Sequence, residues 1–201
     1  ERIVIESAAL YKGGSISFAE SIDTFRENLK DTQPTVFFAV PRIWSKFQSG
    51  ISGKIKPWLL NPLLSTPLIS SFLRSKLKVE LGLSEAKIVL TGAALTPVHL
   101  KKWYRKLGLN LREVYGATES CGAVTITPKD ELSDLNVGRP IAGSKIKIDH
   151  DSGEIIYYSE QNMLGYYKDP DKTKEILRDG WIYSGDKGKL DKNGSLHIVG
   201  R

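Results

Sequence analysis

Cysteine, histidine and a leader segment are scarce or missing in this chain, and each absence excludes a class of protein. The 201 residues include one cysteine, Cys121, which excludes a disulfide framework and a cysteine-cluster metal site. The three histidines (His99, His150 and His197) show none of the spacings of a zinc site. Residue 1 is Glu and no charged-then-apolar leader precedes it, so we expect a cytoplasmic piece of a longer protein.

A hydrophobic run long enough to cross a bilayer is also missing. The apolar stretch 58–73 is interrupted by Pro62 and Pro67, whereas a transmembrane helix needs about 20 mostly apolar residues. We expect short helices here, which pack on the core or lie on a membrane surface. The overall composition, 40% hydrophobic and 26% charged, is that of a folded chain rather than a disordered one.

Positive charge, in contrast, is plentiful and concentrated in the stretch Arg42–Lys106. The chain has a net charge of +6, and this stretch alone holds twelve Lys or Arg against Glu80 and Glu85. Such a stretch suits nucleic acid, an anionic lipid surface or a phosphorylated substrate, and a solvated helical face is the alternative. Its basic residues alternate with aliphatic residues and prolines and match no nucleic-acid motif, so we expect no nucleic-acid partner.

The hydrophobic patterns predict an α/β chain. We expect part of a layered parallel-sheet domain in 1–135, followed by a small antiparallel, barrel-like β module in 136–201. The patterns of the first part predict strands at 3–5, 35–40, 87–91 and 111–115, a helix over 18–29, and a helix that Thr96 caps and Gly108 ends. The last two strands and the helix between them should form a right-handed parallel crossover. The β module should contain two hairpins, 145–148 with 154–157 and 187–190 with 196–199.

Two loops should follow the carboxyl ends of the parallel strands, where open α/β sheets bind ligands. They are Gly92–Ala93–Ala94 and Gly116–Ala117–Thr118–Glu119. In the second loop, Gly116 lets backbone amides approach a phosphate and Thr118 adds a hydroxyl donor. Glu119 supplies a hard oxygen ligand for Mg²⁺, and Tyr115 offers a flat face for a base. By composition alone, however, this short string is more often an ordinary turn.

Four motifs in a fixed order favour the nucleotide interpretation. They are TGAALTP at 91–97, YGATE at 115–119, YSGD at 183–186 and GR at 200–201. Together with segment 165–181 they resemble the AMP-forming acid–CoA ligases, the acyl-adenylate family that includes luciferases and adenylation domains. The resemblance covers the whole chain. It is strongest to long-chain and bubblegum-type acyl-CoA synthetases, because 39–47 resembles their Val-Pro-Arg-aromatic segment.

The resemblance implies a role for each matched position, together with ATP, Mg²⁺ and coenzyme A. Thr118 and Glu119 would be catalytic, with Thr118 on the α-phosphate and Glu119 on Mg²⁺. Asp186, which we expect in a turn between two strands, and Arg201 would bind the ribose. The full set of implied nucleotide-binding positions is Gly92, Ala93, Ala94, Glu113, Val114, Tyr115, Gly116, Thr118, Asp186 and Arg201. Two positions depart from the family pattern, Val114 for a common glycine and Ser184 for a threonine.

The implied function is that of a fragment of an ATP-dependent long-chain fatty acid–CoA ligase, which forms an acyl-adenylate and then a thioester. Its partners would be a fatty acid, ATP and coenzyme A, with peripheral contact to the inner face of an anionic membrane as a further hypothesis. A ligase for an aryl, medium-chain or amino acid is the alternative. The family's phosphate loop and its C-terminal lysine domain are not in the sequence, so we expect the fragment alone to be inactive, with 136–201 ending at the hinge to that domain.

Overall fold

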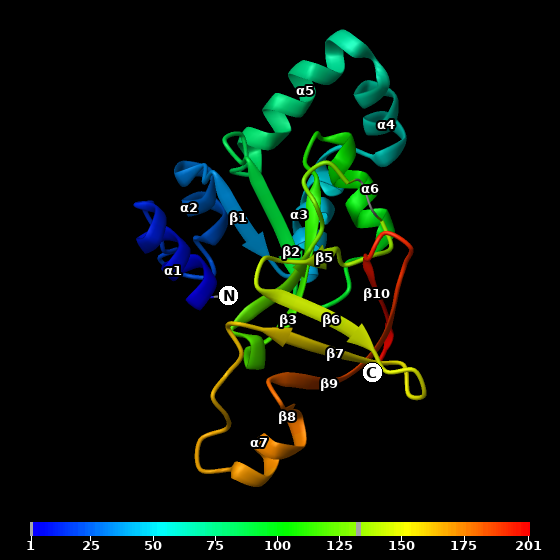
Figure 1. Cartoon of the computed structure of the whole chain (residues 1–201). Coiled ribbons are helices and arrows are strands. Elements are labelled where there is room, and N and C mark those ends of the chain that lie inside the picture. Colours follow the sequence, from blue (N-terminus) through cyan, green and yellow to red (C-terminus); the bar gives the residue numbers. More distant parts are fainter. Residues whose placement is uncertain (1, 132–133) are drawn as a thin grey trace. The chain divides into compact units, whose positions relative to one another are not determined.

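A computed structural model describes residues 2–131 and 134–201, and the chain divides into two compact units (Figure 1). The helical unit comprises Gly13–Leu111, and the β unit comprises Glu1–Lys12 with Arg112–Arg201. The expected α/β class with an antiparallel β module is confirmed. The expected boundary between 135 and 136 stays a prediction.

The helical unit is built on a parallel strand pair, β1 (Val36–Ala39) and β2 (Ile88–Gly92), with Val36 opposite Ile88. Its core is centred on Trp44, which is fully buried. The Trp44 indole N–H donates to the Ala39 carbonyl (3.0 Å), and the Tyr104 hydroxyl donates to the Trp44 carbonyl (2.7 Å). The helices are α2 (Phe25–Thr32), α3 (Pro41–Lys54), α4 (Pro57–Ser65), α5 (Pro67–Glu80) and α6 (Val98–Lys106).

Two details of the helical unit differ from the sequence prediction. The predicted helix over 18–29 begins only at Phe25, because the Ser21 and Thr24 side chains bond to each other's backbone N–H groups (both 3.1 Å) and form a turn. Thr96 is not the N-cap residue of the next helix, because α6 begins at Val98 and Pro97 holds the N-cap position; the Thr96 hydroxyl lies 3.0 Å from that of Thr91. Gly108, with φ +74°, follows the helix end as predicted.

The short helices predicted for 58–73 are confirmed as α4 and the first half of α5. Leu60 and Leu64 of α4 are buried in the core, whereas Trp58 and Phe72 are each 72% exposed. None of the helices in the described parts of the chain is long and apolar enough to span a bilayer.

The β unit contains two groups of antiparallel strands. The first is β3 (Leu111–Ala117), β4 (Gly122–Ile126) and β5 (Arg139–Pro140). The second has the order β10-β9-β7-β6, and β8 pairs with β9. The bounds of this group are β6 Ser144–Ile148, β7 Glu154–Ser159, β8 Leu177–Arg178, β9 Trp181–Leu190 and β10 Leu196–Gly200. Both predicted hairpins are therefore confirmed, β6 with β7 and β9 with β10.

The β unit also has two helices, α1 (Arg2–Lys12) and α7 (Pro170–Ile176). The strand predicted at 3–5 is wrong, because these residues belong to α1. Ala8, Ala9 and Leu10 lie in the next turn and have high helix propensity, which outweighs three β-branched residues in a row. Since β2 and β3 belong to different units, their parallel pairing stays a prediction.

Candidate functional site

Glu119 lies in a sharp turn that directly follows β3. Residues Thr118–Ser120 form a single 3-10 turn, and Cys121 after it adopts a left-handed conformation with φ 52°. The buried hydroxyl of Ser120 accepts the Ala117 N–H (3.1 Å) and lies 3.0 Å from the carbonyls of Ala117 and Gly122. These bonds hold the turn from inside, which leaves Thr118 exposed and Glu119 half-buried.

Gly116, at the start of this loop, has a packing reason for being glycine. A Cβ at this position would clash with the carbonyl oxygen of Gly122 on β4. The close approach of β3 and β4 thus requires glycine whether or not a phosphate binds nearby.

A tyrosine from a distant segment contacts Glu119. The Tyr166 hydroxyl donates a hydrogen bond of 2.6 Å to Glu119 Oε1 across 47 positions of sequence. The Met163 N–H donates to the Glu119 carbonyl oxygen at 2.7 Å. The Tyr166 hydroxyl donates this hydrogen bond to a carboxylate, which favours the neutral phenol. The pKa of Tyr166 is therefore raised to about 12, and its hydroxyl stays protonated at neutral pH.

Asp186 lies in a β-bulge and not in the turn that the sequence predicts. Strand β9 runs without a break through Asp186, with Gly185 in a left-handed conformation (φ +71°) and a register shift opposite β7. The bulge is held by the Ser184 hydroxyl, which donates to the Ile155 carbonyl (2.6 Å), and by the Gly185 N–H, which donates to Glu154 Oε1 (2.8 Å). Bulges re-aim side chains at functional sites, and this one directs Asp186 to Tyr115.

Asp186 connects two other predicted site residues. The Tyr115 hydroxyl donates to Asp186 Oδ2 at 3.0 Å, and Arg201 Nε lies 3.4 Å from Asp186 Oδ1. Burial raises the pKa of Tyr115 well above its ordinary value, so its hydroxyl is a proton donor throughout the physiological range. Residues from the YGATE, YSGD and GR motifs therefore meet at one carboxylate.

The remaining predicted residues have a different surrounding. Glu113 is 2% exposed and its N–H donates to the Thr127 hydroxyl (3.1 Å) inside the sheet, while Val114 is half-buried. Gly92, Ala93 and Ala94 belong to the helical unit, and Ala93 has the left-handed φ of +64° that non-glycine residues rarely adopt. For these five, as for every other predicted site residue, contact with a nucleotide stays a prediction.

Sequence reasoning missed Tyr166 as a site residue. It was part of the segment 165–181 that supported the family resemblance, but it carries no local signal of its partner. The hydrogen bond to Glu119 depends on the path of the chain between them.

The donor set at Glu119 fits one kind of metal ion. Across residues 2–131 and 134–201, no group of three or more His, Cys, Asp or Glu side chains could hold a metal by itself. Mg²⁺ is commonly bound by one or two carboxylates together with substrate phosphates and water. A carboxylate that accepts one hydrogen bond keeps further lone pairs for a cation. Glu119 therefore suits Mg²⁺ that arrives with a nucleotide, and not a closed protein cage.

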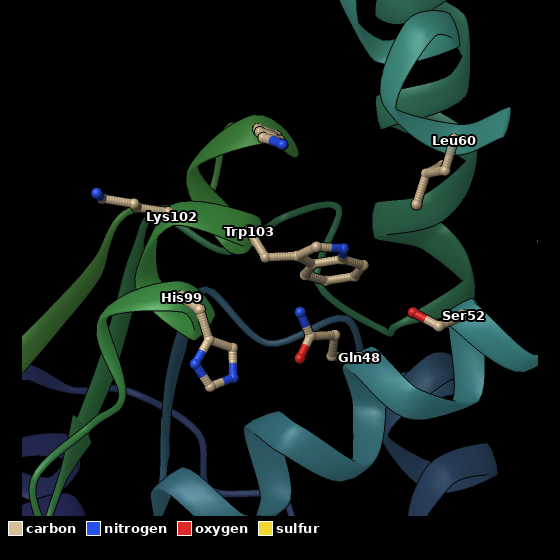
Figure 2. Close-up of a pocket in the computed structure, with 7 residues that line it drawn as sticks. Gln48, Ser52, Leu60, His99, Lys102 and Trp103 are labelled. Atoms are coloured by element: carbon tan, nitrogen blue, oxygen red, sulfur yellow. The ribbon is translucent and has the colours of Figure 1, made fainter. Parts of the chain in front are cut away.

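The helical unit has a pocket of its own between α3, α4 and α6, with a volume of about 350 Å³ (Figure 2). The Trp103 indole and the Gln48 and Ser52 side chains face this space in Figure 2. The lining residues are Gln48, Ser52, Leu60, His99, Lys102, Trp103 and Lys106. These seven residues include no carboxylate, which makes the lining unsuited to a hard metal ion.

Comparison with known proteins identifies the class. The sequence profile of the AMP-binding enzymes matches residues 1–167, and the chain belongs to that family. It is 33% identical to the long-chain-fatty-acid–CoA ligase ACSBG2 of Xenopus laevis, over 94% of this chain and 30% of that protein. It is 30% identical to long chain acyl-CoA synthetase 4 of Arabidopsis thaliana, over 98% of this chain and 35% of that protein. The chain thus spans about a third of the length of these curated relatives.

Solved structures agree with this assignment. The chain superposes on an ATP-bound RpMatB-BxBclM chimera with a TM-score of 0.74 at 25% identity, covering 98% of this chain and 37% of the other. For the o-succinylbenzoate coenzyme A synthetase of Bacillus subtilis in complex with AMP, the TM-score is 0.72 at 19% identity, with 99% and 39% covered. The second likeness shows a common fold.

Proposed function

We propose that this chain is part of an ATP-dependent long-chain fatty acid–CoA ligase, which joins a fatty acid to AMP and then transfers the acyl group to coenzyme A. The observation that carries the proposal is the pair of tyrosine-held carboxylates, Glu119 and Asp186. Glu119 lies within residues 1–167, which match the AMP-binding enzymes, and Asp186 lies in the YSGD motif that resembles the same family. The named relatives, long-chain acyl-CoA synthetases at about 30% identity, support the choice of acid.

Asp186 would receive the ribose of ATP. Its carboxylate accepts hydrogen bonds and is already oriented by the Tyr115 hydroxyl on one oxygen and by Arg201 near the other. Two ribose hydroxyls would donate to lone pairs that these contacts leave available. Because the Asp186 carboxylate is oriented before the nucleotide binds, less side-chain entropy is lost on binding.

Thr118 and Glu119 would act on the phosphates. The exposed Thr118 hydroxyl can donate to an oxygen of the α-phosphate, where negative charge builds up during attack by the fatty carboxylate. Glu119 would hold Mg²⁺, which neutralises phosphate charge when bound. Fixed donors and charges at this loop lower the barrier by positioning and electrostatics, without a covalent step on the protein.

The other predicted residues would shape the nucleotide and acyl space. Gly92, Ala93 and Ala94 have no side chain beyond Cβ, and Ala93, directly after β2, has a left-handed backbone conformation. Glu113, Val114 and Gly116 would contribute backbone along β3, next to the Tyr115 ring. Small side chains leave room for a flat base and for the first carbons of the acid.

We also propose that the protein is cytoplasmic and that its helical unit docks peripherally on an anionic membrane. Helices α3–α5 hold six Lys or Arg against Glu80, and Glu80 itself pairs with Lys30 at 2.9 Å. Trp58 and Phe72 are exposed, as membrane-inserting residues must be, whereas Leu64 packs in the core. In the apolar stretch 58–73, some side chains therefore pack in the core, while others are available for contact with a membrane surface.

Pyrophosphate release by the full-length protein tests the ligase. With ATP, Mg²⁺ and palmitate we expect release well above a no-enzyme blank, followed by palmitoyl-CoA when coenzyme A is added. Octanoate, benzoate and amino acids under the same conditions test the acid. Faster turnover with any of these three would overturn the long-chain assignment, and no release with any acid would overturn the ligase.

Co-sedimentation tests the membrane proposal. Binding to vesicles that contain phosphatidylglycerol should exceed binding to neutral vesicles and should weaken at high salt. W58A/F72A should bind less, with W181A as the control at a tryptophan of the β unit. Equal binding to both vesicle types contradicts the proposal.

A further inference from the structure

A short hydrogen bond joins the side chains of Tyr166 and Glu119. Their hydrogen bond is 2.6 Å long and joins a phenol to a carboxylate, the short and strong type that a charged acceptor produces. Glutamate has three rotatable bonds, and a long carboxylate side chain in a half-exposed loop would otherwise sample several rotamers. The bond selects among them.

The backbone under Tyr166 is itself fixed. The Tyr166 N–H donates to the Thr173 hydroxyl at 2.8 Å, and that hydroxyl donates to the Asp169 carbonyl at 2.8 Å. Asp169 caps helix α7, because its Oδ1 accepts the Lys172 N–H at 2.9 Å. A chain of three bonds thus ties Tyr166 to the first turn of α7.

A second contact holds the Glu119 backbone from the same segment. The Met163 N–H donates to the Glu119 carbonyl at 2.7 Å, three residues before the tyrosine whose hydroxyl binds the side chain. Segment 163–166 therefore donates hydrogen bonds to both the backbone carbonyl and the carboxylate of Glu119. Gly165 between the two contacts has φ +151°, and a Cβ there would approach the Thr173 side chain to 2.8 Å, so the segment passes close to α7.

From this geometry we infer that Tyr166 is a positioning residue for Glu119, holding the carboxylate in one orientation before Mg²⁺ with its nucleotide arrives. The inference rests on the proposed role of Glu119 as the metal ligand. A phenol is a neutral donor, so it orients the carboxylate and leaves the negative charge that attracts the cation.

The test compares Y166F with Y167F in the full-length protein. Y166F removes one hydroxyl and keeps the ring, and Tyr167 next to it is 88% exposed, which makes Y167F a matched control. At saturating ATP and palmitate, Y166F should need about tenfold more Mg²⁺ for half-maximal rate, while kcat at saturating Mg²⁺ stays within about twofold. Tenfold corresponds to ~1.4 kcal/mol. Y167F should leave both values unchanged.

Binding without turnover provides the second readout. Electron paramagnetic resonance can measure Mn²⁺ affinity in the presence of α,β-methylene-ATP, an analogue that releases no pyrophosphate. We expect about tenfold weaker Mn²⁺ binding for Y166F and unchanged binding for Y167F. T173V, which loosens Tyr166 without touching its hydroxyl, should give a smaller shift in the same direction and serves if Y166F is poorly folded.

The outcomes separate this inference from the proposed function. If Y166F lowers the unfolding temperature while its Mg²⁺ requirement and Mn²⁺ affinity equal those of the wild type, Tyr166 is only structural and the inference is overturned. If E119A retains Mg²⁺-dependent turnover, the metal role of Glu119 is wrong instead. Loss of activity in E119A together with a raised Mg²⁺ requirement in Y166F supports both.

Discussion

Two carboxylates of the β unit are each held by a tyrosine hydroxyl, yet their surroundings differ in charge. Glu119 accepts from Tyr166 at 2.6 Å, and Asp186 accepts from Tyr115 at 3.0 Å. Asp186 also lies 3.4 Å from the Arg201 guanidinium, which offsets its charge. A charge-balanced carboxylate suits neutral ribose hydroxyls, whereas a carboxylate oriented by a neutral phenol keeps its charge for a cation. On this difference in charge we expect Glu119, and not Asp186, to be the metal ligand.

The strongest way to break this comparison is E119A, for which we expect the largest effect. Adenylation by the full-length protein should fall by at least about 10²-fold, because a fixed charge near the reacting phosphate is lost. The fold should persist, since the Ser120 hydroxyl and not Glu119 holds the turn. Pyrophosphate release and far-ultraviolet circular dichroism measure the two effects. Near-normal, Mg²⁺-dependent turnover would show that the metal role is misassigned.

The next effect in size is that of D186A. A carboxylate that accepts ribose hydroxyls forms bonds of roughly 1.5–3 kcal/mol each, so kcat/KM for ATP should fall at least about tenfold. The wild type should discriminate against 2′,3′-dideoxy-ATP, and D186A should lose most of that discrimination. Turnover with both nucleotides measures this. If Asp186 only stabilises the bulge, the mutant would be less stable but would prefer ATP by the wild-type ratio.

Y115F sharpens the comparison, with a smaller expected effect. It removes the hydroxyl that orients Asp186 but keeps the ring, and Arg201 still supports the carboxylate. We expect KM for ATP to rise about fivefold with kcat little changed, since one supporting bond of about 1 kcal/mol is lost. Steady-state kinetics at several Mg²⁺ concentrations should show an unaltered Mg²⁺ requirement. A change in that requirement would contradict the separation of the two carboxylates.

The smallest effect concerns alkaline stability. The pKa values of Tyr166 and Tyr157 are raised to about 12, by the bond to Glu119 and by burial respectively. The folded-state pKa of each tyrosine lies above the unfolded value of about 10. The contribution of the neutral phenol to the free energy of unfolding is therefore fully present below pH 10 and is lost as the pH rises through 12. Thermal unfolding between pH 9 and pH 12 should show a shallower decline for Y166F. An identical decline would mean that the Tyr166 bond does not persist in solution.

Much of the fold was predictable because it depends on local pattern. Strand β1 between two prolines, β2 before a small-residue turn, and the two hairpins around His150–Gly153 and Asp191–Gly194 all carry short-range signals. Where a signal had a competitor, prediction failed. The β-branched residues 3–5 are helical because they belong to the same helix, α1, as the strong helix formers after them. Thr96 lies one position before the N-cap of α6, with its hydroxyl 3.0 Å from that of Thr91.

The candidate site divides in the same way. The motifs by themselves determined the family, the candidate residues Thr118, Glu119, Asp186 and Arg201, and the chemistry that their side chains allow. Only the tertiary structure decided that Asp186 sits in a bulge, that Tyr115 and Arg201 meet it, and that Tyr166 reaches Glu119. A motif is a local arrangement of side chains, but a hydrogen bond across 47 or 71 positions depends on how strands pair and helices end between its partners. No pattern within a few residues of Glu119 contains that information.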